Sequence, residues 1–228
     1  MTVMRKFYLA AAAALILCSC GSTSNLTTRQ EQYPKMYEEK PLTLLVMPPI
    51  NNTANVEAKE LLYTSISKPL AEAGYYVISP LLAMDVLKSE SAYDAEMFVD
   101  ASLEKFGKYF GADAVIFSQI DKWTKSGFGV DTSIRYFIRS AKTGETLFDR
   151  KCDLHLNLSQ NSGSSSLLGI LTDLAVSAIN TATTDHIVAA RMANRYIFSD
   201  IPRGKYDSMY GSDQGVTASA KDITATVK

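Results

Sequence analysis

Two stretches near the middle of the chain alternate apolar with polar residues, and this pattern limits the fold more than any other feature. In 130–138 nearly every second residue is apolar, and the same period returns in 148–158. A period of two is typical of a β-strand with one face buried and the other in water. Lys142-Thr143-Gly144 lies between the stretches and favours a turn. We therefore predict an antiparallel hairpin of two half-buried strands.

Short apolar runs and helical patterns alternate elsewhere in the chain. Buried strands are expected at 42–47, 75–79 and 114–120. Helical patterns are expected at 58–73, 81–88, 100–110 and 167–197, the first bent at Pro69. This order predicts an α/β fold: a mixed sheet of about five strands with helices packed on it, including a long C-terminal helix.

The N-terminus has the pattern of a secretion signal. Met4-Arg5-Lys6 is cationic, and the apolar run 7–17 follows it directly. This run is too short to span a bilayer, which needs roughly 20 residues, but it has the length of a signal-peptide core. We therefore predict that residues 1–19 form a signal peptide. The alternative is an ordinary buried N-terminal helix.

The segment Leu17-Cys18-Ser19-Cys20 indicates how this signal ends. An apolar residue stands three places before Cys20 and a small residue directly before it, which resembles the lipobox of bacterial lipoproteins. Cys18 fits less well, because Leu17 would occupy the small-residue position. We predict that Cys20 is acylated and holds the chain on a membrane. No acidic residue closely follows Cys20, so the expected location is the outer membrane, with the domain facing the periplasm.

Composition along the chain predicts four parts. Residues 1–19 are the signal peptide, and the polar segment 20–40 reads as a lipidated flexible tether. Residues 41–198 form the α/β domain. Few apolar residues occur in 199–228, which we expect to be a partly disordered C-terminal extension.

Several functional classes are disfavoured by composition. The formal net charge is −1, which argues against a nucleic-acid binder. His155 and His186 are the two histidines of the sequence, too few for a typical zinc site. Once Cys18 is removed and Cys20 is acylated, Cys152 has no disulfide partner. We predict no metal and no cofactor.

One pair of motifs raises the possibility of an acyl-transfer enzyme. Ser65-Ile66-Ser67-Lys68 has the Ser-x-x-Lys pattern, and Lys142-Thr143-Gly144 follows later, as in penicillin-binding proteins. That chemistry needs the serine at a helix N-terminus, where backbone N–H groups stabilise the oxyanion. Ser65 is instead expected in the middle of a helix, so we interpret the motifs as chance and predict no enzyme.

The segment Leu167-Leu168-Gly169-Ile170-Leu171 is apolar nearly all round. A helix of this kind must bury both sides. One interpretation is that the tether or the C-terminal extension covers it. The other is that Leu167, Leu168, Ile170 and Leu171 bind a partner protein or acyl chains.

Several strings of the chain carry a family resemblance. They are Leu45-Val46-Met47-Pro48-Pro49-Ile50-Asn51-Asn52, Ser67-Lys68-Pro69-Leu70-Ala71-Glu72-Ala73-Gly74-Tyr75-Tyr76-Val77, Phe110-Gly111-Ala112-Asp113-Ala114, Thr184-Asp185-His186 and Ala193-Asn194. Over 42–211 the chain resembles bacterial lipoproteins of unknown function, typified by a neisserial vaccine-candidate lipoprotein.

The resemblance implies an α/β domain like the N-terminal domain of TolB, with no catalytic residues. It also implies a link to a curli-secretion-like lipoprotein or pore subunit, and leaves open whether the chain forms an oligomer. We therefore expect a non-catalytic, membrane-anchored component of an envelope transport or assembly complex. A lipid-binding carrier, with an apolar pocket between the sheet and the long helix, is the alternative.

Overall fold

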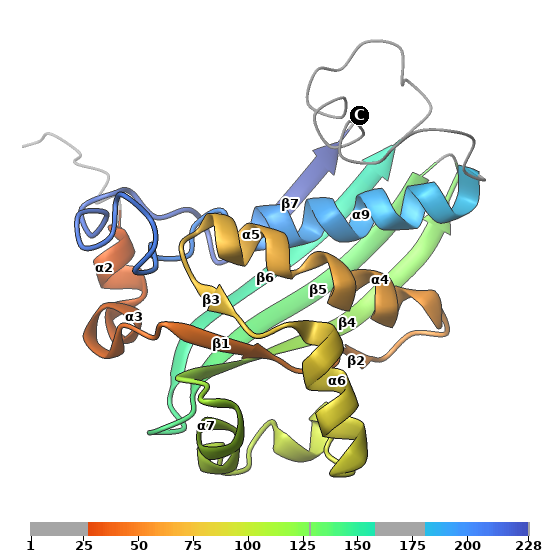
Figure 1. Ribbon diagram of the computed structural model, residues 1–228. Helices are drawn as coiled ribbons and strands as arrows, with labels where there is room; N and C mark the ends of the chain where they lie inside the picture. The colour runs from red at the N-terminus through yellow and green to blue at the C-terminus, as the bar shows by residue number, and fades with distance from the viewer. Residues whose placement is uncertain (1–26, 128, 158–180, 228) are drawn as a thin grey trace, which may run out of the picture.

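The computed structural model describes residues 27–127, 129–157 and 181–227, which build one mixed sheet with helices on both faces (Figure 1). The described strands are β1 (Thr43–Val46), β2 (Ile50–Asn51), β3 (Tyr76–Val77), β4 (Ala114–Ser126), β5 (Gly129–Ser140), β6 (Thr146–Asn157) and β7 (Asp222–Val227). The described helices are α2 (Arg29–Gln32), α3 (Pro34–Glu39), α4 (Glu57–Ser65), α5 (Ser67–Glu72), α6 (Pro80–Ser89), the 3₁₀-helix η1 (Ala95–Phe98), α7 (Glu104–Phe110) and α9 (Thr181–Phe198).

The sheet runs in the order β3-β1-β4-β5-β6-β7, and β2 pairs with β4 beyond the end of β1. β1 is parallel to both β3 and β4, whereas β5 is antiparallel to β4 on one side and to β6 on the other. β7 returns parallel to β6. The predicted α/β class, the β5–β6 hairpin and the C-terminal helix are confirmed. Within the described residues the sheet has seven strands, not about five.

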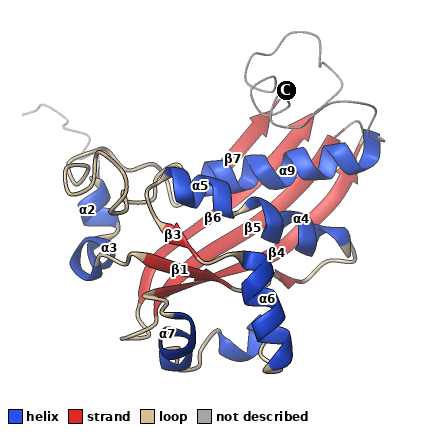
Figure 2. Ribbon diagram, in the orientation of Figure 1, coloured by secondary structure: helices blue, strands red, loops and turns tan. Residues whose placement is uncertain are grey.

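Alternate residues of β4 enter two separate apolar cores, which explains its continuous apolar run. Ile116 and Ile120 face α4, α5 and α9, while Val115 and Phe117 face α6 and α7. A strand covered on both sides shows no polar alternation. Figure 2 shows α4, α5 and α9 along one side of the sheet, with α6 and α7 near its other end.

The prediction of a flexible tether up to residue 40 is wrong for residues 27–40. Thr28 begins α2 with a capping box that includes Glu31, and α3 follows after Tyr33. Tyr33 and Met36 are buried in the larger core, and the Tyr33 ring lies 4.8 Å from that of Phe148. Because the segment is mostly polar, its pattern did not identify Tyr33 and Met36 as core residues. Short helices such as these are stable only through tertiary packing.

The prediction that residues after 199 are partly disordered is also wrong for 199–227. Ile201 and Pro202 are buried, and the turns of 204–216 lead to β7. In β7 the inward positions Ile223, Ala225 and Val227 alternate with exposed polar residues. That period of two was present in the sequence, but the strand is stable only because β6 supplies its hydrogen bonds.

Helix boundaries differ from the sequence-based expectations in three places. The helix expected to bend at Pro69 is divided into α4 and α5 at Ile66. α7 begins at Glu104, so Asp100 is not its cap. The described part of the long helix begins at Thr181, and the expected start at Leu167 lies outside the described residues. None of the described helices is both long and apolar enough to cross a membrane.

Candidate functional site

α6 presents apolar side chains to solvent as well as to the core. Pro80 opens the helix at a position where its missing N–H costs nothing. Ala83 and Leu87 are one turn apart and buried. On the outer side Leu81, Leu82 and Val86 are 73 %, 65 % and 44 % exposed.

The segment after α6 continues this character. Tyr93 and Met97 are both exposed, and the chain is folded back on α6 by the Ala92 N–H, which donates to the Leu87 carbonyl at 2.7 Å. We call Leu81, Leu82, Val86, Tyr93 and Met97 the α6 surface. Single exposed apolar residues are ordinary, but five within seventeen residues of sequence make this segment a candidate interaction site.

Carboxylates surround the α6 surface. Between 81 and 100 there are five exposed acidic residues and one base, Lys88, so the net charge of this segment is −4. The acidic residues are Asp85, Glu90, Asp94, Glu96 and Asp100. Burial and a hydrogen bond with Asp94 raise the pKa of Glu96. In the described part of the chain no group of three or more His, Cys, Asp or Glu could hold a metal ion.

An apolar centre with a charged rim is the usual anatomy of a protein interface. The chemistry of the α6 surface therefore fits a partner segment that offers apolar side chains flanked by Lys or Arg. Sequence reasoning missed this site, although α6 has apolar residues at six of its first eight positions, from Pro80 to Leu87. A helix that is apolar on more than one side was the signal that could have found it.

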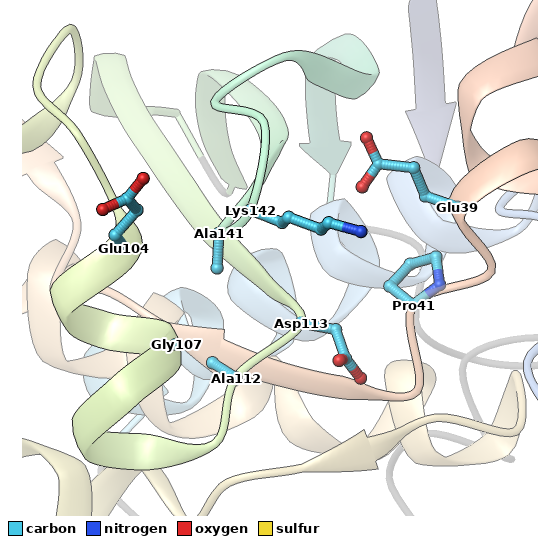
Figure 3. Close-up of a pocket in the computed structure, with 8 residues that line it drawn as sticks. All are labelled: Glu39, Pro41, Glu104, Gly107, Ala112, Asp113, Ala141 and Lys142. Carbon is cyan, nitrogen blue, oxygen red and sulfur yellow. The ribbon is translucent and has the colours of Figure 1, made fainter.

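The structure also contains an open cleft of about 530 Å³ between α3, α7 and the β5–β6 turn. Figure 3 shows Lys142 extending across it toward Glu39, with Asp113 below and Glu104 on the other side. Asp113 accepts hydrogen bonds from the backbone N–H groups of Leu42 and Thr43, both at 2.9 Å. Among the described residues, the lining of the cleft has three carboxylates and one lysine but no serine, cysteine or histidine, so the cleft offers charge pairing.

The Ser-x-x-Lys motif is not arranged for acyl transfer. Ser65 is the last residue of α4, and its hydroxyl donates to the Leu61 carbonyl at 2.7 Å. The same oxygen accepts a hydrogen bond of 2.8 Å from the Asn194 side chain. The single proton of the Ser65 hydroxyl is therefore engaged in the hydrogen bond that it donates to the Leu61 carbonyl. The Lys68 ammonium lies 3.9 Å from Glu72 on the exposed side of α5.

Asn194 connects this serine to the centre of the sheet. Its side-chain oxygen accepts a short hydrogen bond from the Tyr136 hydroxyl, and all of these groups are buried or half-buried. Burial raises the pKa of Tyr136 well above its ordinary value. The chain Tyr136–Asn194–Ser65 therefore satisfies buried polar groups between β5, α9 and α4, which is a structural role.

Lys142-Thr143-Gly144 forms the predicted hairpin turn. Gly144 has φ of 73°, which glycine adopts without strain, and its N–H donates to the Ser140 carbonyl at 3.0 Å. The Thr143 hydroxyl donates to Glu39 at 2.8 Å, which fastens the turn to α3. The motif is thus explained by folding.

The two histidines also have local partners. The Trp123 indole N–H donates to Nδ1 of His186 at 2.6 Å, so that nitrogen is not available to a metal. Nδ1 of His155 lies 2.5 Å from Asp131 on the solvent side of the sheet. On the same face Arg135 pairs with Asp149 at 2.9 Å.

The described part of the interface between α9 and the sheet is filled with side chains. The ring of Phe198 lies 5.0 Å from Tyr136 and 6.1 Å from Phe148, and Ala189 and Ala193 are buried beside them. The lipid pocket expected there is not present among these residues. Cys20 and the predicted binding residues Leu167, Leu168, Ile170 and Leu171 lie outside the described residues.

Comparison with known proteins identifies the family. A family model described as "Putative lipoprotein GNA1162-like" matches residues 31–206. The chain belongs to this family. The family's matched region begins within α2 and ends in the turns after α9, so it includes the α6 surface. This confirms the resemblance to the neisserial lipoproteins.

The chain is also similar to individual proteins. The chain is 27 % identical to the putative lipoprotein NMB1124/NMB1162 of Neisseria meningitidis, over 80 % of this chain and 84 % of the relative. Among solved structures it is similar to lipoprotein GNA1162 of N. meningitidis, at 26 % identity, 58 % and 94 % coverage and a TM-score of 0.48. The LpoB C-terminal domain of Salmonella enterica shares 18 % identity, with 54 % and 93 % coverage and a TM-score of 0.36.

Proposed function

We propose that this family member is a non-catalytic lipoprotein that docks another envelope protein through the α6 surface. The observation that carries the proposal is the exposure of Leu81, Leu82 and Val86 on a helix whose other side is already buried. Fully burying such a side chain contributes roughly 1.5–3 kcal/mol. A partner that covers all three would gain several kcal/mol before the costs of association.

The acidic residues around this surface narrow the partner's chemistry. A like-charged surface would be repelled, whereas one carrying Lys or Arg beside an apolar centre would be guided into place. We take the partner to be a lipoprotein or pore subunit of an envelope transport or assembly complex. A curli-secretion-like lipoprotein is the partner class implied by the family resemblance.

The anchor is the second part of the proposal. We infer that residues 1–19 are removed, that Cys20 is acylated, and that the protein is held on the periplasmic side of the outer membrane. Support comes from the apolar run 7–17, the lipobox ending at Cys20 and membership of a lipoprotein family. Leu167, Leu168, Ile170 and Leu171 stay a second proposed site for a partner or for acyl chains.

The docking proposal is tested with acylated, tagged protein taken from membranes under mild crosslinking. Leu82→Ser with Val86→Ser should lose an envelope lipoprotein or pore subunit that the wild type retains, because the apolar contact is removed. The control is Tyr109→Ser, which alters an apolar residue on α7 that is more exposed than either Leu82 or Val86. Equal recovery of the partner by all three proteins would contradict docking at α6.

A charge variant examines the rim separately. Glu90→Lys with Asp94→Lys should weaken capture of the same partner and reduce its sensitivity to salt, since rim charges act mainly on association rate. If a variant of the 167–171 segment abolishes capture while the α6 variants do not, the docking site lies there instead. Bound lipid in the purified domain without a protein partner would favour the carrier.

Two cysteine variants examine the anchor. Cys20→Ala should release the protein into the soluble periplasm, whereas Cys18→Ala should stay with the membrane fraction. The pair is matched because the two cysteines are two residues apart. Membrane retention of Cys20→Ala would show that acylation at Cys20 is not what holds the protein.

A further inference from the structure

The domain begins much closer to the proposed anchor than its sequence indicated. Thr27 is the first described residue, and Thr28 already caps α2. Six residues, 21–26, separate Cys20 from Thr27. A fully extended chain advances about 3.6 Å per residue, so Thr27 lies within roughly 25 Å of an acylated Cys20. A tether reaching residue 40 would have allowed about three times that distance.

The first described residues are tied by hydrogen bonds to a loop near the other end of the chain. The Arg29 N–H donates to the Val216 carbonyl at 2.8 Å, and the Ala218 N–H donates to the Thr27 carbonyl at 2.8 Å. Thr28 and Thr217 form an antiparallel bridge between these bonds. Whatever holds Cys20 near a membrane therefore holds residues 216–218 near it as well.

Buried charges fix this junction in place. The Arg29 guanidinium lies 3.1 Å from Asp200 and 3.3 Å from Asp213, and all three residues are buried. Asp213 also accepts the Arg203 N–H at 2.9 Å. Breaking one partner of a buried ion pair costs about 3–5 kcal/mol, so the loop and the N-terminus move as one unit.

The same loop exposes apolar and aromatic side chains. We define the 205–216 loop by its exposed residues Tyr206, Met209, Tyr210 and Val216, of which Tyr206 is 67 % exposed. The turns that display them are closed by backbone bonds, such as the Tyr210 N–H to the Asp207 carbonyl at 3.1 Å. Tyrosine is enriched at membrane interfaces, because its ring is apolar and its hydroxyl stays hydrated.

The charge of the loop suits a lipid headgroup layer. Lys205 is exposed, whereas Asp213 is buried beside Arg29 and Asp207 lies 3.6 Å from Arg203. The loop thus offers a cation and apolar side chains, with both of its carboxylates paired. The α6 surface has the opposite character, because the five acidic residues between 81 and 100 outnumber the single base, Lys88, and would be repelled by anionic lipids.

We propose that the 205–216 loop rests in the headgroup region of the membrane that holds Cys20. This inference rests on the proposed acylation. Figure 1 shows the loop beside α2, away from α6 and α7. Contact at the loop would orient the molecule so that the α6 surface is presented to the periplasm rather than to the lipid. The loop would add a weaker, orienting contact to the anchor that the acylated Cys20 provides.

Fluorescence quenching tests the contact. Acylated Tyr206→Trp protein is reconstituted in vesicles of phosphatidylethanolamine and phosphatidylglycerol that contain brominated lipid. The matched control is Tyr109→Trp on α7, because Tyr109 is also highly exposed, at 79 %. Trp123 is buried and common to both proteins. Brominated lipid should reduce the emission of Tyr206→Trp at least two-fold more than that of the control.

The outcomes separate the two proposals. If the proteins float with the vesicles and quenching is equal, the loop is not at the interface and this inference is overturned, while the anchor stands. If the acyl chain is absent and neither protein floats, both proposals fail. Met209→Trp gives an independent measurement should Tyr206→Trp fold poorly, and it should be quenched like Tyr206→Trp.

Discussion

Arg150 should be the most sensitive polar position in the molecule. It lies on the inward side of β6 and is among the largest fully buried side chains. One guanidinium nitrogen donates to the carbonyls of Tyr196 and Ile197, at 3.1 and 2.6 Å. The other donates to the Ser219 hydroxyl and the Ala220 carbonyl, at 2.7 and 2.8 Å. A single side chain therefore joins the end of α9 to the segment that leads into β7.

The magnitude follows from these four bonds. A hydrogen bond to a charged group contributes about 1.5–3 kcal/mol, so four give roughly 6–12 kcal/mol before costs. Burying the guanidinium costs several kcal/mol, and its Nε atom is buried without a hydrogen-bond partner among the described residues. Burial also lowers the pKa of Arg150, which reflects the same cost. We expect Arg150→Met to lower the free energy of unfolding by about 3–5 kcal/mol.

Urea unfolding and amide hydrogen exchange measure this loss. Methionine keeps most of the apolar stem, so the change isolates the lost bonds and leaves the α9 carbonyls unsatisfied. Exchange protection should fall first in β7 and in 217–221. Arg135→Met is the matched control, because Arg135 pairs with Asp149 on the solvent side of the neighbouring strand. It should cost no more than about 1 kcal/mol. If Arg150→Met costs as little as this control, the reasoning is refuted.

Three further changes have expected outcomes. Gly74→Ala should lower the free energy of unfolding in urea by about 2–4 kcal/mol, because φ is +88° and a Cβ would lie 2.7 Å from the Gly204 carbonyl oxygen. Gly111→Ala should cost less, because Gly111 also has a positive φ but faces open space. Equal losses for the two variants would contradict the role of the close approach. Burial raises the pKa of the Cys152 thiol to about 11, so in a chain whose other cysteines are alanine a disulfide reagent at pH 8 should label it only after unfolding. A hydrogen bond from His155 lowers the pKa of Asp131. The resulting stabilisation of the fold is fully present above the ordinary carboxyl pKa and is lost as the pH falls through the lowered pKa. Thermal unfolding should therefore show that Asp131→Asn costs up to about 1 kcal/mol at pH 7 and nothing in strong acid.

The position of Arg150 shows what the period of two can predict about a buried residue and what it cannot. In β6 the residues Phe148, Cys152, Leu154 and Leu156 point inward, and the same count places Arg150 on the inward side. The period of two is thus enough to place position 150 on the buried face, but it does not identify the partners of the charge, since Ile197 and Ala220 lie 47 and 70 residues away. A buried charge depends on groups that only folding brings together.

For the α6 surface, the residue pattern predicts the helix, and only the fold decides which side of it is buried. Apolar residues occupy more than one side of α6, so that by pattern alone either side could have been the core. Burial of Ala83 and Leu87 against the sheet decided which residues remain outside. The prediction of a binding segment at 167–171 rested on the same kind of pattern and stays a prediction.

The sequence alone determined the α/β class, the β5–β6 hairpin and the glycine turn, because periods of two and of 3.6 and turn chemistry depend on neighbouring residues. The lipoprotein family was indicated by the resemblance of several short residue strings and not by periodicity. The tertiary structure alone decided that residues 27–40 and 199–227 are ordered. Each segment is too polar to bury its own backbone and cannot fold by itself. They are stable together because Arg29 pairs with Asp200 and Asp213. The energy of these ion pairs depends on the distance between the charges, and residues so far apart in the sequence come close only in the folded chain.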